Sequence, residues 1–575
     1  MTKFLIGVVT GIVLTLLTGV ILVFSLVRLG GEKRPTVSGG STLVLRLEGE
    51  IPERAPVEIP LPFLEQQTPL TMLDTWDILR KAAVDSRIKA VILEPRGLAV
   101  GWGKMQELRA SLEQFRRSGK PLVAYLRSPG TREYYLASAA DKVYLSPEDL
   151  LDVKGLRAEL MFFRRTLDKL GVQVEIEHAG KYKDFGDTFV RDKMSPETRE
   201  VINSVLDEIY GHLVDTLAKA RKKTPEQMRA IIDDGPFLAD QALAKGLVDA
   251  LVYEDQMLDD LKKRAKLGEI KKVSHRDYAK VPASSLGLEG GSRIAVLMAD
   301  GGITRGSSSG DGSSDDGIGS IGFNRMLRRI ADDGSIRGVV VRIDSPGGDA
   351  IASDDIWREM NLLARRKPLV ISMSDVAASG GYYMAMTGDP IVAYPGTYTG
   401  SIGVVYGKAN LKGLYDKLGI TKDILTRGRF ADVDSDYSPL TEPARRKLRE
   451  GIDNTYKTFV AKVAEARKRK YEDVEPLAQG RVWLGSQAKQ RGLIDELGGL
   501  DRAIELVKKK ARIGATEKVT LVAYPPKRSV FDLLWGHTPE SVLDGKLKGL
   551  LKTWQLRLWA QGGLMRLMPY TVDVR

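Results

Sequence analysis

Two short segments far apart in the sequence carry residues that together suit nucleophilic cleavage of an acyl bond. Ser379 lies in VAASGGYYMA, where an apolar run ends and a helix is expected to begin near Gly380, so its hydroxyl is expected at an exposed turn. Lys183 lies much earlier, in HAGKYKDFGD. A serine hydroxyl needs a base near neutral pH, and a lysine amine can serve once burial keeps it neutral. The two segments therefore predict Ser379 as nucleophile and Lys183 as general base.

Two further motifs supply the remaining groups that such a reaction needs. Ser401, in TYTGSIGV, is a candidate to orient the amine of Lys183 through a hydrogen bond. The attacked carbonyl oxygen needs paired donors, and glycine-rich backbone can approach it closely. Gly380, directly after the nucleophile, and Gly347-Gly348, in RIDSPGGDA, are the candidate sources of those backbone N–H groups.

The composition argues against several other chemistries. The chain has no Cys, which removes thiol nucleophiles, thiolate zinc sites and iron–sulfur clusters. Its four His residues are far apart in sequence, so neither a histidine-rich metal site nor a serine triad is expected, and we expect no metal and no cofactor. The net charge is +12, but basic and acidic residues are interleaved, so we expect no nucleic-acid partner.

Residues 41–265 and 292–513 look like two copies of one unit. STLVLRLEGEI in the first copy matches SRIAVLMADGGI in the second, and GKPLVAYL matches RKPLVISM. Both copies then carry a tyrosine pair, Tyr134-Tyr135 and Tyr382-Tyr383. In each copy, short Val/Ile/Leu-rich runs alternate with helical stretches, which predicts an α/β fold with a mostly parallel sheet, built twice.

The two copies differ at the residues that could do chemistry. When the tyrosine pairs are aligned, the first copy has Thr131 in place of Ser379, and Arg and Glu replace the two glycines that follow. At the same shift, the second copy has Ala431 in place of Lys183. Each copy thus supplies one residue that the other lacks. The sequence leaves open whether the two meet within one chain or across subunits.

The N-terminal end reads as an uncleaved membrane anchor. Residues 4–27 form 24 residues without a charge, long enough to span a bilayer, and the apolar run continues to basic residues without a small-residue cleavage site. More Lys and Arg follow this segment than precede it, so flanking charge does not settle its orientation.

The connector and one loop are expected to carry no chemistry. Residues 266–291 read as a connector between the copies, and residues 306–317 as a flexible loop. The tail, residues 514–575, is amphipathic and basic. Three docking sites are open to it: the membrane surface, a neighbouring subunit or its own domain.

Taken together, these motifs resemble the long tandem form of the protease IV, or signal peptide peptidase A, family. The anchor, the tandem repeat, SPGGDA, AASGGYYMA, TGSIGV and GKYKDFGDTFVRDKMSPETRE carry the resemblance, which extends to about residue 513. It implies a ClpP/crotonase-like fold in each copy and a Ser/Lys dyad. The residues it assigns are Ser379 (nucleophile), Lys183 (base), Ser401 (orienting the lysine) and Gly347, Gly348 and Gly380 (oxyanion hole).

The resemblance also implies a biological role. Members of that family are endopeptidases that degrade hydrophobic signal-peptide remnants after signal peptidase has released them. They are single-pass proteins of the bacterial cytoplasmic membrane, with the catalytic part outside the cytoplasm, and the long form assembles as a homotetramer that opens toward the lipid. Two other readings stay open: a crotonase-type enzyme acting on acyl-CoA, and a catalytically silent membrane scaffold.

Overall fold

The computed structural model describes residues 37–54, 69–306, 317–526 and 565–568, together with five single positions before residue 20. All but those five positions of the predicted anchor, residues 4–27, therefore lie outside the described residues, as do most of the 306–317 loop and most of the tail. Within the described part, none of the helices has both the length and the apolar character that a bilayer span requires.

The first copy is built on a parallel sheet whose central strands are largely apolar, as expected for strands buried on both faces. The strand order is β8-β4-β3-β2-β1-β9. The strands are β1 (Ser41–Glu48), β2 (Ile88–Arg96), β3 (Leu122–Leu126), β4 (Lys142–Leu145), β8 (Ala250–Leu251) and β9 (Lys271–Ser274). Its main helices are α2 (Met72–Val84), α3 (Trp102–Arg116), α4 (Thr131–Ala137) and α10 (Glu254–Arg264).

The second copy repeats this plan. The strand order is β19-β17-β15-β13-β10-β21, with β16 and β20 attached beside β15. The strands are β10 (Ser292–Asp300), β13 (Ile336–Ser345), β15 (Leu369–Ala378), β16 (Ile391–Ala393), β17 (Tyr398–Gly400), β19 (Val482–Leu484), β20 (Glu496–Leu497) and β21 (Val519–Tyr524). The helices are α12 (Ser320–Asp332), α13 (Ala350–Arg366), α14 (Gly380–Met384), α18 (Gly485–Gln490) and α19 (Leu500–Lys510).

Matching contacts confirm the repeat. The hydroxyl of Tyr134 donates to the carbonyl of Leu247 at 2.6 Å, and the hydroxyl of Tyr382 donates to that of Leu493 at 2.7 Å. Strand β9 pairs in parallel with β1, the first strand of the first copy, and β21 pairs in parallel with β10, the first strand of the second copy. Since β9 lies within residues 266–291, part of the predicted connector is an edge strand of the first sheet.

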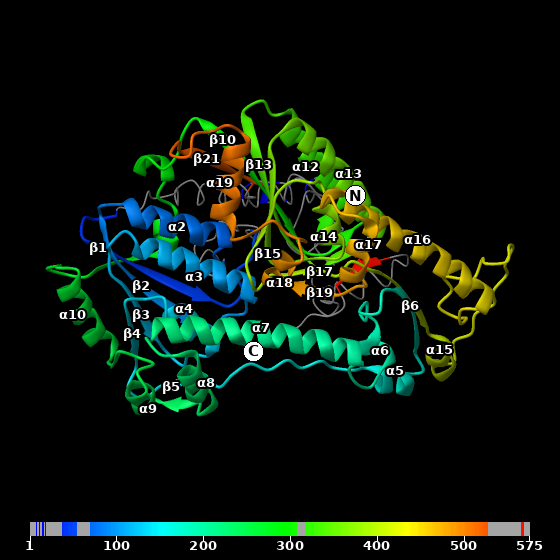
Figure 1. Cartoon of the computed structure of the whole chain (residues 1–575), viewed down its shortest axis with the longest axis horizontal. Coiled ribbons are helices and arrows are strands. Elements are labelled where there is room, and N and C mark those ends of the chain that lie inside the picture. The colour runs from blue at the N-terminus through cyan, green and yellow to red at the C-terminus, as the bar shows by residue number, and fades with distance from the viewer. Residues whose placement is uncertain are drawn as a thin grey trace.

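The two copies pack directly against each other. Helix α3 of the first copy contacts β15 of the second, and the indole of Trp76 in α2 donates to Asp501 in α19 at 2.6 Å. Helix α7 (Pro196–Ala220) begins at the N-cap Ser195 and contacts both α4 and β19, so that it runs beneath both copies (Figure 1). Its counterpart, α16 (Glu442–Ala466), buries an apolar face that includes Ile452, Phe459 and Val463.

A third sheet joins the copies, in the order β12-β11-β14-β22-β18-β6. Strand β6 (Gln173–Ala179) of the first copy runs antiparallel to β18 (Val404–Asn410) of the second, with Ala179 opposite Val404. The chain leaves β6 four residues before Lys183 and enters β18 three residues after Ser401. This pairing therefore brings the two candidate residues to one place. The other strands are β11 (Ile303–Thr304), β12 (Ile318–Gly319), β14 (Gly347–Asp349) and β22 (Met565–Leu567).

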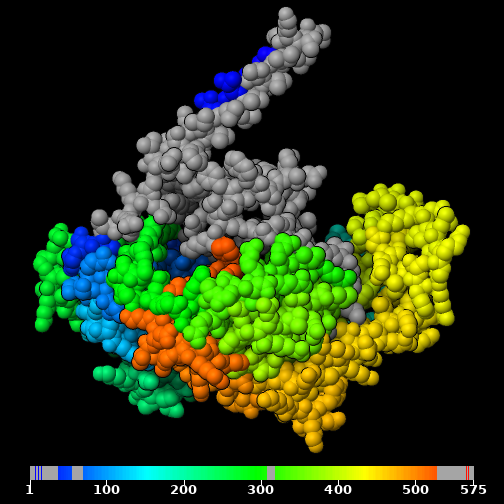
Figure 2. All heavy atoms as spheres, turned by 90° about the horizontal axis from the view of Figure 1, so that it is seen from above, coloured from blue at the N-terminus to red at the C-terminus, as the bar shows by residue number. Residues whose placement is uncertain are grey.

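The remaining elements are short and lie at the periphery. The segment around α15 projects from one side of the body, in yellow in Figure 2. These elements are β5 (Leu150–Leu151), β7 (Phe237–Leu238), α5 (Arg164–Leu170), α6 (Asp187–Val190), α8 (Pro225–Asp233), α9 (Ala239–Ala244), α11 (His275–Ala279), α15 (Lys412–Leu418), α17 (Tyr471–Val474) and two 3-10 turns, Ala283–Leu286 and Glu475–Leu477.

Candidate active site

Ser379 occupies the strained junction between β15 and α14. Its backbone has φ 53° and ψ −113°, a conformation that a residue with a side chain adopts only when its surroundings hold it there. The backbone N–H of Ser379 donates to the carbonyl of Gly400 at 2.8 Å, which ties the junction to β17. The sequence favours an exposed turn, but the structure buries Ser379 completely, with its Oγ against the amine of Lys183.

Lys183 reaches this junction from the loop that follows β6. The loop is fastened to the second copy, since the N–H of Tyr182 donates to the carbonyl of Gln479 at 2.8 Å. The side chain of Lys183 is fully buried. Its Nζ lies 2.8 Å from Oγ of Ser379, 2.8 Å from Oγ of Ser401 and 2.9 Å from the carbonyl oxygen of Ser401. The three oxygen atoms all belong to uncharged groups.

Ser401 is held as firmly as Ser379. It also has a positive φ, 49°, and its backbone N–H donates to the carbonyl of Arg481 at 2.7 Å. Lys183, Ser379 and Ser401 thus meet within one chain, with the lysine contributed by the first copy and both serines by the second.

The predicted glycines flank the same junction. Gly380 is the first residue of α14, and Gly347 and Gly348 open β14 just after β13 ends. Ser345, the last residue of β13, pairs with Ala377, and its carbonyl oxygen would lie 2.6 Å from a Cβ placed on Gly381. The glycine-rich end of β13 therefore packs against the start of α14.

Strand β22, from the C-terminal end of the chain, lies between β14 and β18. Gly347 pairs antiparallel with Leu567, Val405 pairs with Met565, and the N–H of Met568 donates to the carbonyl of Pro346 at 2.8 Å. Leu567 and Met565 are buried in a small apolar cluster with Phe185, two residues after the lysine. This part of the tail packs on the candidate site of its own chain.

A buried carboxyl group adjoins the lysine in sequence. Thr198 donates to Oδ2 of Asp184, while Oδ1 is buried without a hydrogen-bond partner. Burial raises the pKa of Asp184 from its usual 3.8 to about 7.

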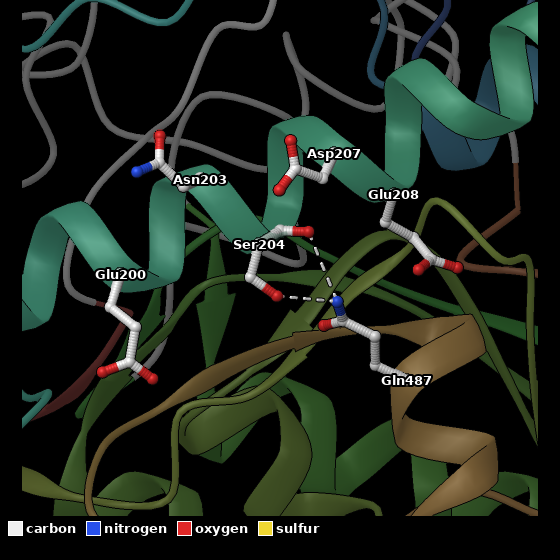
Figure 3. A pocket seen from close by; sticks show the side chains of 6 residues that line it. All are labelled: Glu200, Asn203, Ser204, Asp207, Glu208 and Gln487. Atoms are coloured by element: carbon white, nitrogen blue, oxygen red, sulfur yellow. Dashed lines mark hydrogen bonds between the residues drawn. The ribbon is translucent and has the colours of Figure 1, made fainter.

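A hollow of about 550 Å³ lies outside the dyad, against α7. It is lined by Glu200, Asn203, Ser204, Asp207, Glu208 and Gln487. Figure 3 shows Gln487 of α18 bonded to Ser204 across it, at 3.0 Å between Nε2 and Oγ. Among the described residues, no group of three or more His, Asp or Glu side chains is placed to hold a metal ion.

A family model described as peptidase family S49 matches residues 114–268 and 361–514, one segment in each copy. The chain belongs to peptidase family S49. It is accordingly a serine peptidase, which favours the peptidase reading over a crotonase-type enzyme or a silent scaffold.

Relatives of this S49 peptidase span most of its length. A chloroplastic serine protease SPPA from Arabidopsis thaliana is 37% identical over 90% of this chain and 76% of its own. Protease 4 from Salmonella typhi is 32% identical over 82% of this chain and 76% of its own. A ClpP1 mutant from Listeria monocytogenes aligns with 36% of this chain and 94% of its own at 13% identity, with a TM-score of 0.24, which is too low to assign a fold.

The sequence missed the residues that shape the lysine pocket of this S49 peptidase. Gly403 and Gly480 both contact Lys183. Gly403 lies within TYTGSIGV, where only Ser401 is assigned a role, and Gly480 belongs to no motif noted above. The pairing of β6 with β18 also had no local signal, because the two segments lie in different copies.

Proposed function

We propose that this S49 peptidase is a membrane-anchored endopeptidase in which Ser379 is the nucleophile and Lys183 the general base. The observation that carries the proposal is the 2.8 Å contact between Nζ of Lys183 and Oγ of Ser379, with both side chains fully buried. A buried amine loses hydration that would favour its charged form, and the oxygen atoms of Ser379 and Ser401 that lie within 2.9 Å of this one belong to uncharged groups. This environment supports a lysine that is neutral at working pH.

The geometry suits each proton transfer. A neutral amine has two N–H donors and one lone pair; the donors fit the two oxygen atoms of Ser401, and the lone pair fits the hydroxyl of Ser379. As Oγ of Ser379 attacks the peptide carbonyl, Lys183 takes the hydroxyl proton and then gives it to the leaving amine. Water next attacks the acyl-enzyme and gives a proton to Lys183. Lys183 then returns this proton to Oγ of Ser379 as the acid product leaves.

The glycines at the junction are placed to stabilise the negative oxygen formed in each attack. Backbone N–H groups act well here because they are already oriented and lie where water is excluded. We assign Gly380, together with Gly347 and Gly348, to this oxyanion hole. Their positions beside the start of α14 and the end of β13 support the assignment.

Substrates are proposed to be the hydrophobic remnants of signal peptides. The edges of β14 and β18 accept an extended segment, as β22 illustrates, and Phe185, Val405 and Ile176 form an apolar surface for its side chains. The proposed location is the bacterial cytoplasmic membrane, held by residues 4–27 with the catalytic part outside the cytoplasm. We also propose that the protein assembles as a homotetramer in contact with lipid.

Cleavage of two synthetic peptides by the detergent-purified protein tests this function. One carries the apolar core of a signal peptide, and the other is a polar peptide of the same length. We expect about tenfold or faster cleavage of the apolar peptide, and none by Ser379→Ala. Equal rates for the two peptides would contradict the proposed substrate class, and cleavage by Ser379→Ala would contradict the nucleophile.

A further inference from the structure

The strand that delivers Ser379 contains a bulge just before the nucleophile. Strands β13 and β15 run in register as far as Ile343 opposite Met373, and pairing resumes at Ser345 opposite Ala377. Asp344 alone therefore faces three residues of β15, Ser374 to Val376. A bulge bends a strand and re-aims the side chains that follow it. Here the residues that follow are Ala377, Ala378 and Ser379.

Two aspartates hold the bulge in shape. Oδ1 of Asp344 accepts the N–H of Val376 at 3.0 Å, which satisfies a backbone donor that the interrupted ladder leaves unpaired. The carboxylate of Asp375 accepts the N–H groups of Gly101 and Lys104, each at 2.7 Å. These two donors belong to the first turn of α3, in the other copy. Asp375 therefore ties the bulge to the positive end of that helix.

Helix α3 approaches the bulge so closely that its first turn requires glycine. A Cβ on Gly101 would lie 2.5 Å from Cγ of Asp375, and a Cβ on Gly103 would lie 2.7 Å from the carbonyl oxygen of Ser374. These separations are shorter than any van der Waals contact allows. The sequence GWGK at residues 101–104 thus fits the start of α3 to the bulge of the second copy.

Lys104 completes the contact. Its side chain is nearly buried, and its Nζ lies 2.7 Å from Oδ2 of Asp344. Burial alone would lower the pKa of Lys104, but the charges of Asp344, Glu53 and Asp375 raise it above the usual value, so the side chain stays cationic. The same cation offsets the negative charges of Asp344 and Asp375, which are drawn together at the bulge.

We propose that Lys104 is a positioning residue for the peptidase reaction, holding the bulge of β13 and β15 in the shape that aims Ser379. Asp344 lies three residues before Gly347, and Asp375 lies four before Ser379. One cation therefore fixes both the nucleophile and the strand that leads to the oxyanion glycines. This inference rests on the proposed function.

The test compares Lys104→Met with a matched change, Lys81→Met. Lys81 is a buried lysine of the neighbouring helix α2, where it donates to the carbonyls of Ala279 and Val281 at 2.9 and 2.8 Å and pairs with Asp77. Both variants lose a buried ammonium, but only Lys104 contacts the bulge. The readouts are the rate of labelling by a fluorescent fluorophosphonate, kcat and KM for the apolar peptide, and Tm.

We expect Lys104→Met to lower the labelling rate and kcat by about tenfold or more, with KM within about twofold of wild type. Lys81→Met should keep the labelling rate within about twofold of wild type, even if its Tm falls as far as that of Lys104→Met. Labelling of folded Lys104→Met at the wild-type rate would overturn the inference, and so would equal losses in the two variants.

If Lys104→Met does not fold, Asp375→Asn decides the matter. An amide has one oxygen, so it can accept only one of the two N–H groups of α3, and we expect labelling to slow by about fivefold or more. The wild-type rate in that variant would overturn the inference. Absence of labelling in wild type would instead overturn the proposed function, and this inference with it.

Discussion

The backbone of Gly480 packs directly against Lys183. A Cβ on Gly480 would lie 2.6 Å from Cβ of Lys183, and the φ of Gly480 is 76°, which favours glycine. On another side, a Cβ on Gly403 would lie 3.0 Å from Cδ of the lysine. Two glycines of the second copy therefore confine the lysine that the first copy supplies, and they fix where its amine ends.

Gly480→Ala should displace Lys183 and slow the enzyme. We expect kcat to fall by about tenfold or more, because a misplaced base loses most of its contribution to proton transfer. The matched control is Gly419→Ala: its φ is 70°, but it has no atom within 4 Å of the added Cβ. Both variants carry the same backbone strain, so equal activities would show that contact with Lys183 is unimportant.

Ser401→Ala should weaken the reaction without abolishing it. The variant loses the hydroxyl 2.8 Å from Nζ of Lys183 but keeps the carbonyl at 2.9 Å. Loss of one hydrogen-bond partner costs about 1–3 kcal/mol, or about 5- to 150-fold in kcat. Steady-state kinetics measure this change. Ser111→Ala, which removes another buried serine hydroxyl, in α3, is the control, and an equal effect there would point to a general loss of packing.

Removal of residues 565–575 should speed the reaction of Ser379. Strand β22 fills the space between β14 and β18 and must leave before an extended substrate can pair there. We expect fluorophosphonate labelling to rise by about threefold or more after the deletion. Leu567→Asp, which opposes burial of the same strand at full length, should act in the same direction. Unchanged labelling in both would show that β22 does not obstruct the site.

Asp184 should make stability depend on pH. Its pKa in the folded state is about 7 against a usual 3.8, so the folded protein holds this proton more tightly than the unfolded chain does. The resulting stabilisation is present below pH 3.8 and is lost as the pH rises through 7. Asp184→Asn should therefore show a smaller fall in Tm between pH 5 and pH 8.5 than wild type.

The control for this comparison is Asp168→Asn, which changes an exposed carboxylate on α5 and should leave the fall in Tm unchanged. If the Tm of Asp184→Asn falls between pH 5 and pH 8.5 as much as that of wild type, other groups cause the pH dependence.

Much of this site could be read from the sequence because duplication provides an internal comparison. Ser379 and Lys183 stand out as residues that one copy has and the other lacks, and the tyrosine pairs set the alignment that shows it. The pairing that joins them could not be predicted. Register between segments in different copies depends on tertiary packing, which leaves no pattern within β6 or β18 alone.

The bulge before Ser379 was hidden for a related reason. The run LVISMSDVAA reads as one buried strand, and the two extra residues in it become visible only when β13 is laid beside it. The motif GWGK likewise has no meaning until α3 is seen against the other copy. Local patterns predict elements, whereas contacts between the copies decide which of their residues matter.

Labelling of the detergent-purified protein with a fluorescent fluorophosphonate tests the dyad most directly, since it needs no knowledge of the substrate. Wild type and Thr131→Ala should be labelled equally, and Ser379→Ala and Lys183→Ala, both folded, should not be labelled. Labelling of Lys183→Ala at the wild-type rate would contradict the account, because Ser379 would then be activated without the lysine that lies beside it.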